Sequence, residues 1–247
     1  MTKQKFAAFD IDGTLFRSGL QREVFYELTK MGIVPQSLID ESTIKFREWR
    51  HRVHGNAFQE FDMYMINALD STLPNLRISD YEKAANLVIE KRAENIYVYT
   101  RDLLKQLKSE GYFLLAISGS QHELVEPFAQ KYGFDAWIGQ EWEKDTEQEY
   151  FTGKRTYTHT GKEKILQTFM DKHDLTMTDS YAVGDSGGDI GILSIVDHPI
   201  AFNPTYDLLE VAMEKGWKII IERKNTSFEL AKEPTLGKYI LEKTNQQ

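Results

Sequence analysis

The sequence predicts an α/β protein built on an open, mainly parallel β-sheet. Short apolar runs at residues 6–9, 112–117 and 180–184 are typical of buried strands. Stretches with helical apolar spacing separate these runs, and each run ends in polar or acidic residues. Because ligands bind beyond the carboxyl ends of strands in such a sheet, the three polar ends indicate one functional site.

The first apolar run ends in two carboxylates, Asp10 and Asp12, and then in Gly13. Side chains alternate along a strand, so both carboxylates leave on the same side. Two like charges held this close need a cation or a proton between them, which favours a divalent metal. An ordinary solvated turn is the alternative reading of these residues alone. A calcium loop of the EF-hand type is not supported, because the glutamate required at its end is missing.

The next segment is predicted to be entirely helical. Apolar residues at helical spacing begin at Leu20, and Gly32 and Pro35 end that helix. Three further helices are expected at residues 37–53, 57–69 and 79–94, the last starting with a capping box of Ser79 and Glu82. This insert is too long for a simple crossover and is long enough to form a lid.

The α/β alternation resumes after the insert. Helices are expected at residues 100–110, 122–132 and 162–172, and further strands at residues 199–202 and 218–221. Residues 137–142 and 151–158 are predicted to pair as a hairpin with an acidic tip. We find no internal repeat and no linker between separate domains.

Composition excludes several classes of protein. A net charge of −8 argues against a generic binder of nucleic acid or of an anionic membrane, because such binders need clustered cations. The absence of cysteine excludes disulfides, thiolate metal sites and cysteine nucleophiles. No apolar run is long enough for a signal peptide or a membrane span, so a cytoplasmic protein is expected.

Four motifs in order carry a family resemblance: Asp10 with Asp12, Ser118, Lys162 directly after Gly161, and Asp185 with Asp189. This order resembles the haloacid dehalogenase-like phosphohydrolase superfamily, in its phosphoserine-phosphatase-like branch, subfamily IB. The resemblance extends over residues 6–223. It implies a three-layer Rossmann-like core at residues 1–16 and 96–247, with a helical cap of the C1 type at residues 17–95.

The resemblance also implies a role for each motif residue. Asp10 would attack phosphorus to form an aspartyl-phosphate, and Asp12 would act as general acid and then as general base. Gly13, Ser118 and Gly119 would bind the phosphoryl group. Lys162 would neutralise both the nucleophile and that group.

The implied cofactor is Mg²⁺, with Asp10, Asp12, Asp185 and Asp189 as its site. Asp12 would contribute its backbone carbonyl, and Asp189 would orient a metal-bound water or hold Lys162. Family members often have asparagine before the second aspartate, whereas Gly188 stands there in this sequence.

Less specific interpretations remain for some of these residues. Lys154 and Lys164 are rivals of Lys162, because lysines are frequent on solvated surfaces. Ser118 could be a turn residue and Asp189 a helix cap. Two other groups are weaker candidates: His122 for substrate contact, and the pair His51 and His54, which has no apparent third metal ligand.

The expected substrate is a small phosphorylated metabolite. Phosphoserine phosphatases of this branch place a glutamate about nine residues after the nucleophile, where this sequence has Gly19 and the nearest carboxylate is Glu23. They also place a lid arginine about seven residues past a lid phenylalanine; if Phe58 is that phenylalanine, Met65 stands at the arginine position. Arg47, Arg50 and Arg52 are the alternatives for this arginine from elsewhere in the lid. We therefore hypothesise a phosphomonoester other than phosphoserine. The alternatives are a phosphoserine phosphatase, a phosphomutase and a phosphate-binding regulatory protein without turnover. Oligomeric state is left open.

Overall fold

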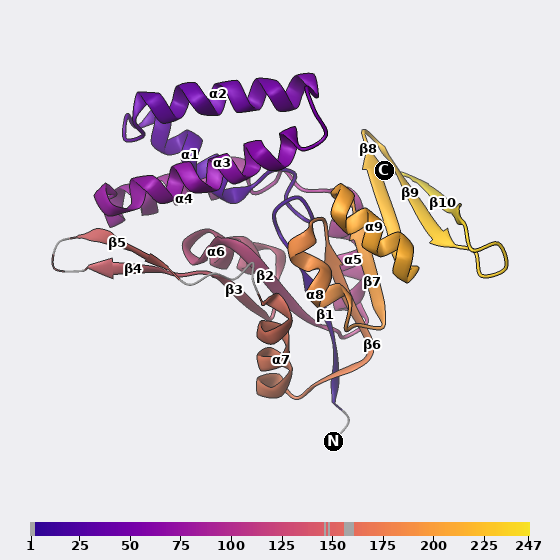
Figure 1. The fold of residues 1–247 in the computed structure, drawn as a ribbon. Helices are drawn as coiled ribbons and strands as arrows, with labels where there is room; N and C mark the ends of the chain where they lie inside the picture. The colour runs from indigo at the N-terminus through magenta and orange to yellow at the C-terminus, as the bar shows by residue number, and fades with distance from the viewer. Residues whose placement is uncertain (1–2, 146, 148, 156–160) are drawn as a thin grey trace.

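The protein is built around an eight-stranded, mainly parallel sheet (Figure 1). The computed structural model describes residues 3–145, 147, 149–155 and 161–247. The strand order is β10-β9-β8-β7-β6-β1-β2-β3. Strands β8, β7, β6, β1, β2 and β3 are parallel to one another, whereas β9 pairs antiparallel with both β8 and β10. The strands are β1 (Gln4–Phe9), β2 (Phe113–Gln121), β3 (Ala136–Gln140), β6 (Leu175–Gly184), β7 (His198–Phe202), β8 (Lys218–Arg223), β9 (Thr226–Lys232) and β10 (Tyr239–Gln246).

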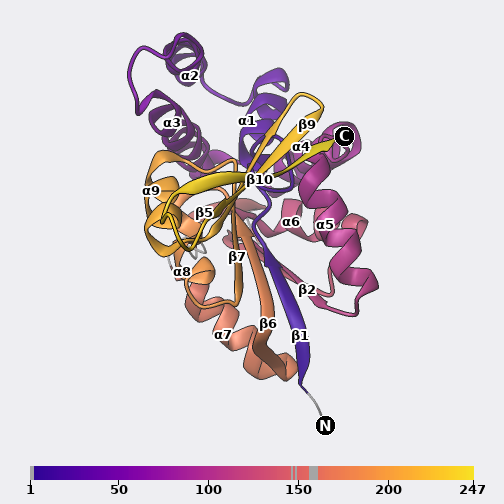
Figure 2. The ribbon, with the colours of Figure 1, turned by 90° about the vertical axis from the view of Figure 1, so that its right-hand side faces the viewer.

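Helices cover both faces of the sheet, as Figure 2 shows. In β1, Ala7 and Phe9 pack in the core shared with α5 (Val98–Ser109) and α6 (His122–Tyr132). Phe6 and Ala8 face the other core, shared with α7 (Lys162–His173), α8 (Ile190–Leu193) and α9 (Tyr206–Lys215). This alternation buries every apolar side chain of β1, as expected for a central parallel strand. The predicted α/β fold class is confirmed.

Four helices between β1 and α5 lie above the carboxyl edge of the sheet in Figure 1. We call them the cap helices: α1 (Leu20–Lys30), α2 (Gln36–His51), α3 (Ala57–Thr72) and α4 (Ile78–Arg92), with the short 3₁₀ helix η1 (Leu73–Asn75) between α3 and α4. All four helices expected in this segment are therefore present. No described residue between positions 36 and 94 belongs to a named strand, as predicted.

A two-stranded hairpin, β4 (Trp142–Asp145) and β5 (Tyr150–Arg155), packs against α4. The rings of Tyr81, Trp142 and Phe151 lie 5.1–5.5 Å apart. The prediction of one hairpin strand over residues 137–142 was wrong, because residues 136–140 form β3 and pair with β2 in the main sheet. Of the second predicted strand, residues 156–158 lie outside the described residues.

The hairpin also explains why the predicted capping box at Ser79 was wrong. Helix α4 begins at Ile78, so Ser79 lies inside its first turn, and the N-cap residue Arg77 makes no side-chain cap. The Ile78 amide donates instead to the carbonyl of Glu149, and Arg77 forms a bridge with Tyr150. Backbone pairing with the hairpin, rather than a serine hydroxyl, fixes the start of this helix.

The sequence reasoning missed the antiparallel edge formed by β9 and β10. The buried positions of β9 include Ser227 and Glu229, so the strand has no apolar alternation. Glu229 accepts hydrogen bonds from Lys218 at 3.3 Å and from Asn245 at 2.9 Å. These bonds offset the cost of burying a carboxylate there. Across the described residues, no helix combines the length and the apolar character that a membrane crossing requires.

Candidate active site

The polar ends of three adjacent strands meet at the carboxyl edge of the sheet. Strand β1 lies between β6 and β2, and the Asp10 amide donates to the carbonyl of Val183 at 3.0 Å. Asp10 follows β1 and Asp185 follows β6, whereas Ser118 lies within β2 because that strand continues to Gln121. The structure therefore brings together motif residues that are more than a hundred positions apart in the sequence.

Lys162, at the first position of α7, connects two of the carboxylates. Its Nζ lies 2.7 Å from Asp10 and 2.7 Å from Asp189, and all three side chains are buried. Burial acts to lower the pKa of Lys162, but the two carboxylates outweigh it and raise that pKa above the usual value. Of the rival lysines, Lys164 is exposed and Lys154 pairs with Glu143 at the hairpin.

The carboxylates are more numerous than the buried cation can neutralise. Burial raises the pKa of Asp10 to about 7 although Lys162 opposes the change. Burial and then the charge of Asp10 raise the pKa of Asp185 well above its usual value. One lysine cannot neutralise Asp10, Asp185 and Asp189 together, so the site favours either a proton or a further cation.

Asp189 holds the loop that follows β6. One of its oxygens accepts from Lys162, while the other accepts from the amides of Asp185 and Ser186, each at 3.1 Å, and from the Ser186 hydroxyl at 3.2 Å. Ser186 and Asp189 thereby form a capping box around the short 3₁₀ helix η2 (Gly187–Asp189). Gly184 is required beneath it, because a Cβ atom there would come within 2.4 Å of the Asp189 side chain.

Asp12 is oriented by three donors. The Leu20 amide, at the start of α1, donates to one carboxylate oxygen at 2.6 Å. The hydroxyls of Ser118 and Ser120 donate to the other oxygen at 2.9 and 2.7 Å. Our sequence reasoning missed Ser120, although two serines one residue apart on a strand project to the same side. Gly119 lies between the two serines, and its carbonyl accepts a hydrogen bond from the side-chain amide of Gln21 at 3.4 Å.

Gly13 and Thr14 connect the loop after β1 to Asp185. Gly13 has a φ of +84°, and a Cβ atom there would lie 2.1 Å from an oxygen of Asp185. Only glycine combines this backbone conformation with so close an approach. The Thr14 hydroxyl donates to the other Asp185 oxygen at 3.4 Å.

The donor set suits a small divalent cation. Oxygens from Asp10, Asp185 and Asp189 all lie within 4.8 Å of one another. Carboxylate oxygens in such an arrangement are the ligands that Mg²⁺ prefers, and Mg²⁺ commonly keeps several waters in addition. Because both Asp189 oxygens already accept hydrogen bonds, Asp10 and Asp185 are the freer ligands.

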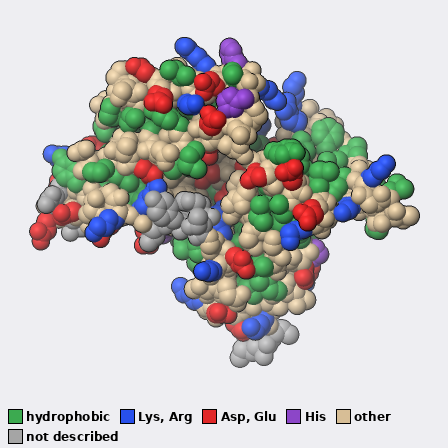
Figure 3. Space-filling model, viewed as in Figure 1, with side chains coloured by type: hydrophobic (Ala, Val, Ile, Leu, Met, Phe, Trp, Pro, Cys, Tyr) green, Lys and Arg blue, Asp and Glu red, His purple; other side chains and the backbone are tan. Residues whose placement is uncertain are grey.

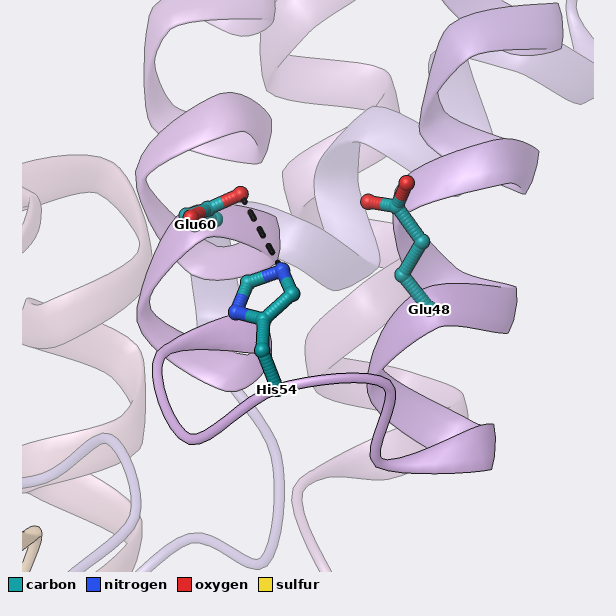
Figure 4. Close-up of side chains that lie close together, drawn as sticks. All are labelled: Glu48, His54 and Glu60. Atoms are coloured by element: carbon teal, nitrogen blue, oxygen red, sulfur yellow. Dashed lines mark ion pairs between the residues drawn. The ribbon is translucent and has the colours of Figure 1, made fainter.

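A second group of potential metal ligands, Glu48, His54 and Glu60, lies on the cap (Figure 4). Of the histidine pair that is a weak metal-ligand candidate in the sequence, His54 belongs to this group and His51 does not. Lys45 lies 3.0 Å from Glu48 and 3.2 Å from Glu60, and His54 lies 3.7 Å from Glu60. A lysine therefore already supplies the positive charge that this group needs.

The cap presents a polar pair toward the acidic site that our sequence reasoning did not identify. Arg22 lies 3.5 Å from Asp62, and its guanidinium lies over the rings of Trp49 and Phe61. Burial raises the pKa of Asp62, with Arg22 opposing the change and the charge of Asp12 adding to it. The sequence shows both residues, but no linear spacing connects them to the motifs.

Other residues singled out in the sequence have local partners. Met65 is buried in the cap core, and Gly19 is the N-cap residue of α1. Glu23, the nearest carboxylate after Gly19, accepts from Ser18 at 2.7 Å. His122 lies 3.4 Å from Glu126 on its own helix.

Two relatives are similar in sequence to part or most of this chain. A histidinol-phosphatase of Neisseria meningitidis serogroup C (strain 8013) is 26% identical over 226 residues, which is 88% of this chain and 98% of the relative. Phosphoserine phosphatase SerB1 of Mycobacterium tuberculosis (strain ATCC 25618 / H37Rv) is 28% identical over 130 residues, or 51% of this chain. That alignment covers only 42% of the length of SerB1.

Solved structures show the same fold. A Bordetella pertussis Tohama I protein of unknown function has a TM-score of 0.68 at 19% identity, over 90% of this chain and 99% of the other. A phospho-aspartyl intermediate analogue of phosphoserine phosphatase has a TM-score of 0.62 at 22% identity, over 90% and 95% of the two chains. A profile of haloacid dehalogenase-like hydrolases matches residues 7–194, from β1 through α8, and so includes every motif residue described above. The chain belongs to the haloacid dehalogenase-like hydrolase family.

Proposed function

We propose that this hydrolase is a magnesium-dependent phosphatase that cleaves a small phosphomonoester through an aspartyl-phosphate on Asp10. The proposal rests on the buried ion pairs of Lys162 with Asp10 and Asp189, next to Asp185 and Asp12. The Lys162 Nζ lies 2.7 Å from a carboxylate oxygen of each partner. Nucleophile, cation and a second carboxylate thus converge from separate elements. The names of the relatives, histidinol-phosphatase and phosphoserine phosphatase, support the same reaction class.

We assign Asp10 as the nucleophile. Lys162 fixes one of its oxygens by a hydrogen bond at 2.7 Å, which leaves the other free to attack phosphorus. The bond from phosphorus to the leaving oxygen breaks as the bond to Asp10 forms. Lys162 also stabilises the charge on the phosphoryl oxygens, and such stabilisation is the main task of a protein in phosphoryl transfer.

We assign the proton transfers to Asp12. Protonated, it would donate to the leaving oxygen; ionised, it would take a proton from the water that cleaves the aspartyl-phosphate. Ser118 and Ser120 orient its carboxylate through the hydrogen bonds described above. Ser118 would turn its hydroxyl to a phosphoryl oxygen once substrate is bound, while Ser120 continues to hold Asp12.

Magnesium would be held by Asp10, by the backbone carbonyl of Asp12 and by Asp185. When bound, it supplies positive charge for the phosphoryl oxygens. We assign Asp189 to positioning rather than to direct ligation, because its oxygens already accept from Lys162 and from the loop after β6. Residues 17–95 would form the cap that excludes water from the site.

We further propose that phosphoserine is not the preferred substrate. Met65 is buried in the cap core and Gly19 has no side chain, so neither position supplies a polar group for the amine or carboxylate of phosphoserine. A phosphomutase is the remaining alternative that uses the same nucleophile. A regulatory protein without turnover is disfavoured, because both the nucleophile and the acid–base carboxylate are present.

The test is magnesium-dependent release of nitrophenolate from p-nitrophenyl phosphate. Chelation by EDTA should abolish release, and added Mg²⁺ should restore it. Asp10→Asn should be inactive, whereas Asp171→Asn, an exposed aspartate on α7, should match the wild type. Turnover that persists in EDTA or in Asp10→Asn would refute the mechanism.

Asp12→Asn separates the two steps. Nitrophenolate is a good leaving group and needs little protonation, so the variant should release a burst of it and then stall. Acid quenching should trap a phosphoryl adduct on the peptide that contains Asp10. A mutase would instead transfer the group to an added acceptor and release little inorganic phosphate.

A further inference from the structure

A cavity of about 770 Å³ lies where the cap helices meet the core. Five segments line it: the loop after β1, the α2–α3 turn, the residue before α5, the loop after β7 and the end of β8. Figure 1 shows the α2–α3 turn and the tip of β8 on the same side of the molecule. In Figure 3, Lys, Arg and His side chains gather on that end of the cap.

Four cationic side chains line this cavity: Arg17, Arg52, Arg223 and Lys224. Within the part of the chain that the structure describes, none of the four pairs with a carboxylate. The whole chain carries a net charge of −8, so this group of four cations has the opposite sign to the net charge of the protein. Like charges around one cavity attract an anion into it.

The one carboxylate among the lining residues already accepts hydrogen bonds from backbone amides. Glu222 is buried, and its oxygens accept from the backbone amides of Val98 at 3.2 Å and Tyr99 at 2.9 Å. It therefore serves the amino end of α5. His54, which also lines the cavity, lies 3.7 Å from Glu60.

Aromatic rings form another part of the cavity wall. Trp49 and Phe58 have ring centroids 5.2 Å apart, and the Arg17 guanidinium lies 5.2 Å from the centre of the Tyr97 ring. Such walls suit an organic group and not only a free inorganic ion.

The cavity borders the loops that hold the catalytic carboxylates. Arg17 lies on the loop that begins at Asp12, where Asp12 and Phe16 form a backbone bridge. On the other side, Pro204 lines the cavity, and the next residue, Thr205, donates its amide to the carbonyl of Asp185 at 2.8 Å. The cavity is thus next to the loops that carry Asp12 and Asp185.

We infer that this cavity receives the leaving group of the substrate, and that this leaving group carries an anionic group of its own, a carboxylate or a second phosphate. The inference rests on the proposed phosphatase function and deepens it by naming the substrate class. It disfavours cationic leaving groups such as that of histidinol phosphate.

The test compares phenyl phosphate with para-carboxyphenyl phosphate and hydroquinone bisphosphate, which add a carboxylate or a phosphate to the same ring. We expect kcat/KM to be about tenfold higher for at least one anionic compound, the size of one charge-assisted hydrogen bond. The better of the two identifies the anion. Raising the salt concentration should reduce the preference, because the cations are partly exposed.

The double variant Arg223→Gln/Lys224→Gln should remove most of the preference by raising KM, with little change for phenyl phosphate. Lys105→Gln/Lys172→Gln removes the same charge from exposed sites elsewhere and should keep the preference. If phenyl phosphate is hydrolysed as well as both anionic compounds, or if the first variant slows all three equally, the inference is wrong.

Binding to Asp10→Asn, measured by calorimetry, separates this inference from the proposed function. Tighter binding of an anionic compound that depends on Arg223 and Lys224 would support the inference even if the wild type released no phosphate. Equal binding of all three compounds would overturn it even if the wild type were an active phosphatase.

Discussion

Replacing Lys162 with methionine tests whether the buried lysine is the element that holds the site together. The substitution keeps a long, flexible side chain but removes the charge. The lysine side chain is 5% exposed, and those of its partners Asp10 and Asp189 are 7% and 0% exposed, so solvent can replace little of what is lost.

The expected loss of stability is large. Each of the two hydrogen bonds is charge-assisted and contributes about 1.5–3 kcal/mol. Removing one member of a buried ion group costs about 3–5 kcal/mol, because the partners stay buried without compensation. We therefore expect Lys162→Met to lower the free energy of unfolding by about 3–5 kcal/mol and kcat by about 10²–10³-fold.

The assay is urea unfolding near neutral pH in EDTA, so that bound metal does not mask the loss. Lys164→Met, on the exposed face of the same helix, is the control and should lie within about 0.5 kcal/mol of the wild type. If Lys162→Met unfolds at the same urea concentration as this control, the buried pairing does not stabilise the fold and the reasoning fails.

Three further changes test separate parts of the site and fold. Gly13→Ala should abolish turnover, because the new Cβ would lie 2.1 Å from Asp185. The control is Gly32→Ala: Gly32 has a φ of +74°, but no atom beyond its chain neighbours lies within 4 Å of the new Cβ. This control should cost about 1–2 kcal/mol of stability and leave kcat unchanged. Equal activity of the two alanine variants would contradict the close approach. Ser120→Ala removes one of the two hydroxyls that donate to Asp12, the proposed acid–base residue, so kcat should fall about five- to tenfold at unchanged KM for p-nitrophenyl phosphate. An unchanged kcat would show that Ser120 does not position Asp12. Hydrogen bonds to Asp179 lower its pKa, and the bond from Lys5 of β1 contributes most. The ionised form of Asp179 therefore stabilises the fold. That stability is complete above the usual aspartate pKa of about 4 and is lost as the pH falls below it. The Tm difference between Asp179→Asn and the wild type should therefore shrink from about pH 7 to about pH 3. A constant Tm difference would refute this link between pKa and stability.

The sequence was sufficient to predict the parts of the site that follow strands. The buried alternation of β1 and the Asp10–Asp12 spacing are local features, as is the position of Lys162 at the start of a helix. Each depends on neighbouring residues in the chain, so periodicity and turn chemistry reveal it.

The parts that could not be predicted depend on segments that meet only in the folded chain. Arg22 meets Asp62 because α1 and α3 pack together, and Arg223 reaches the cavity because β8 lies in the same sheet as β1. Strand β9 was missed for a different reason. Its buried Glu229 breaks the apolar pattern, and hydrogen bonds from its tertiary partners Lys218 and Asn245 offset the cost of that burial.

The role of Asp189 explains how the site tolerates a departure from the family pattern. Gly188 stands where related proteins often have asparagine, yet it is exposed. The contacts that matter pass through its neighbours: Asp189 accepts from Lys162 on one side and from the Asp185 and Ser186 amides on the other. A single carboxylate therefore sets the position of both the cation that pairs with Asp10 and the loop that carries Asp185. Because none of these bonds involves a side chain at position 188, glycine there leaves the constellation intact.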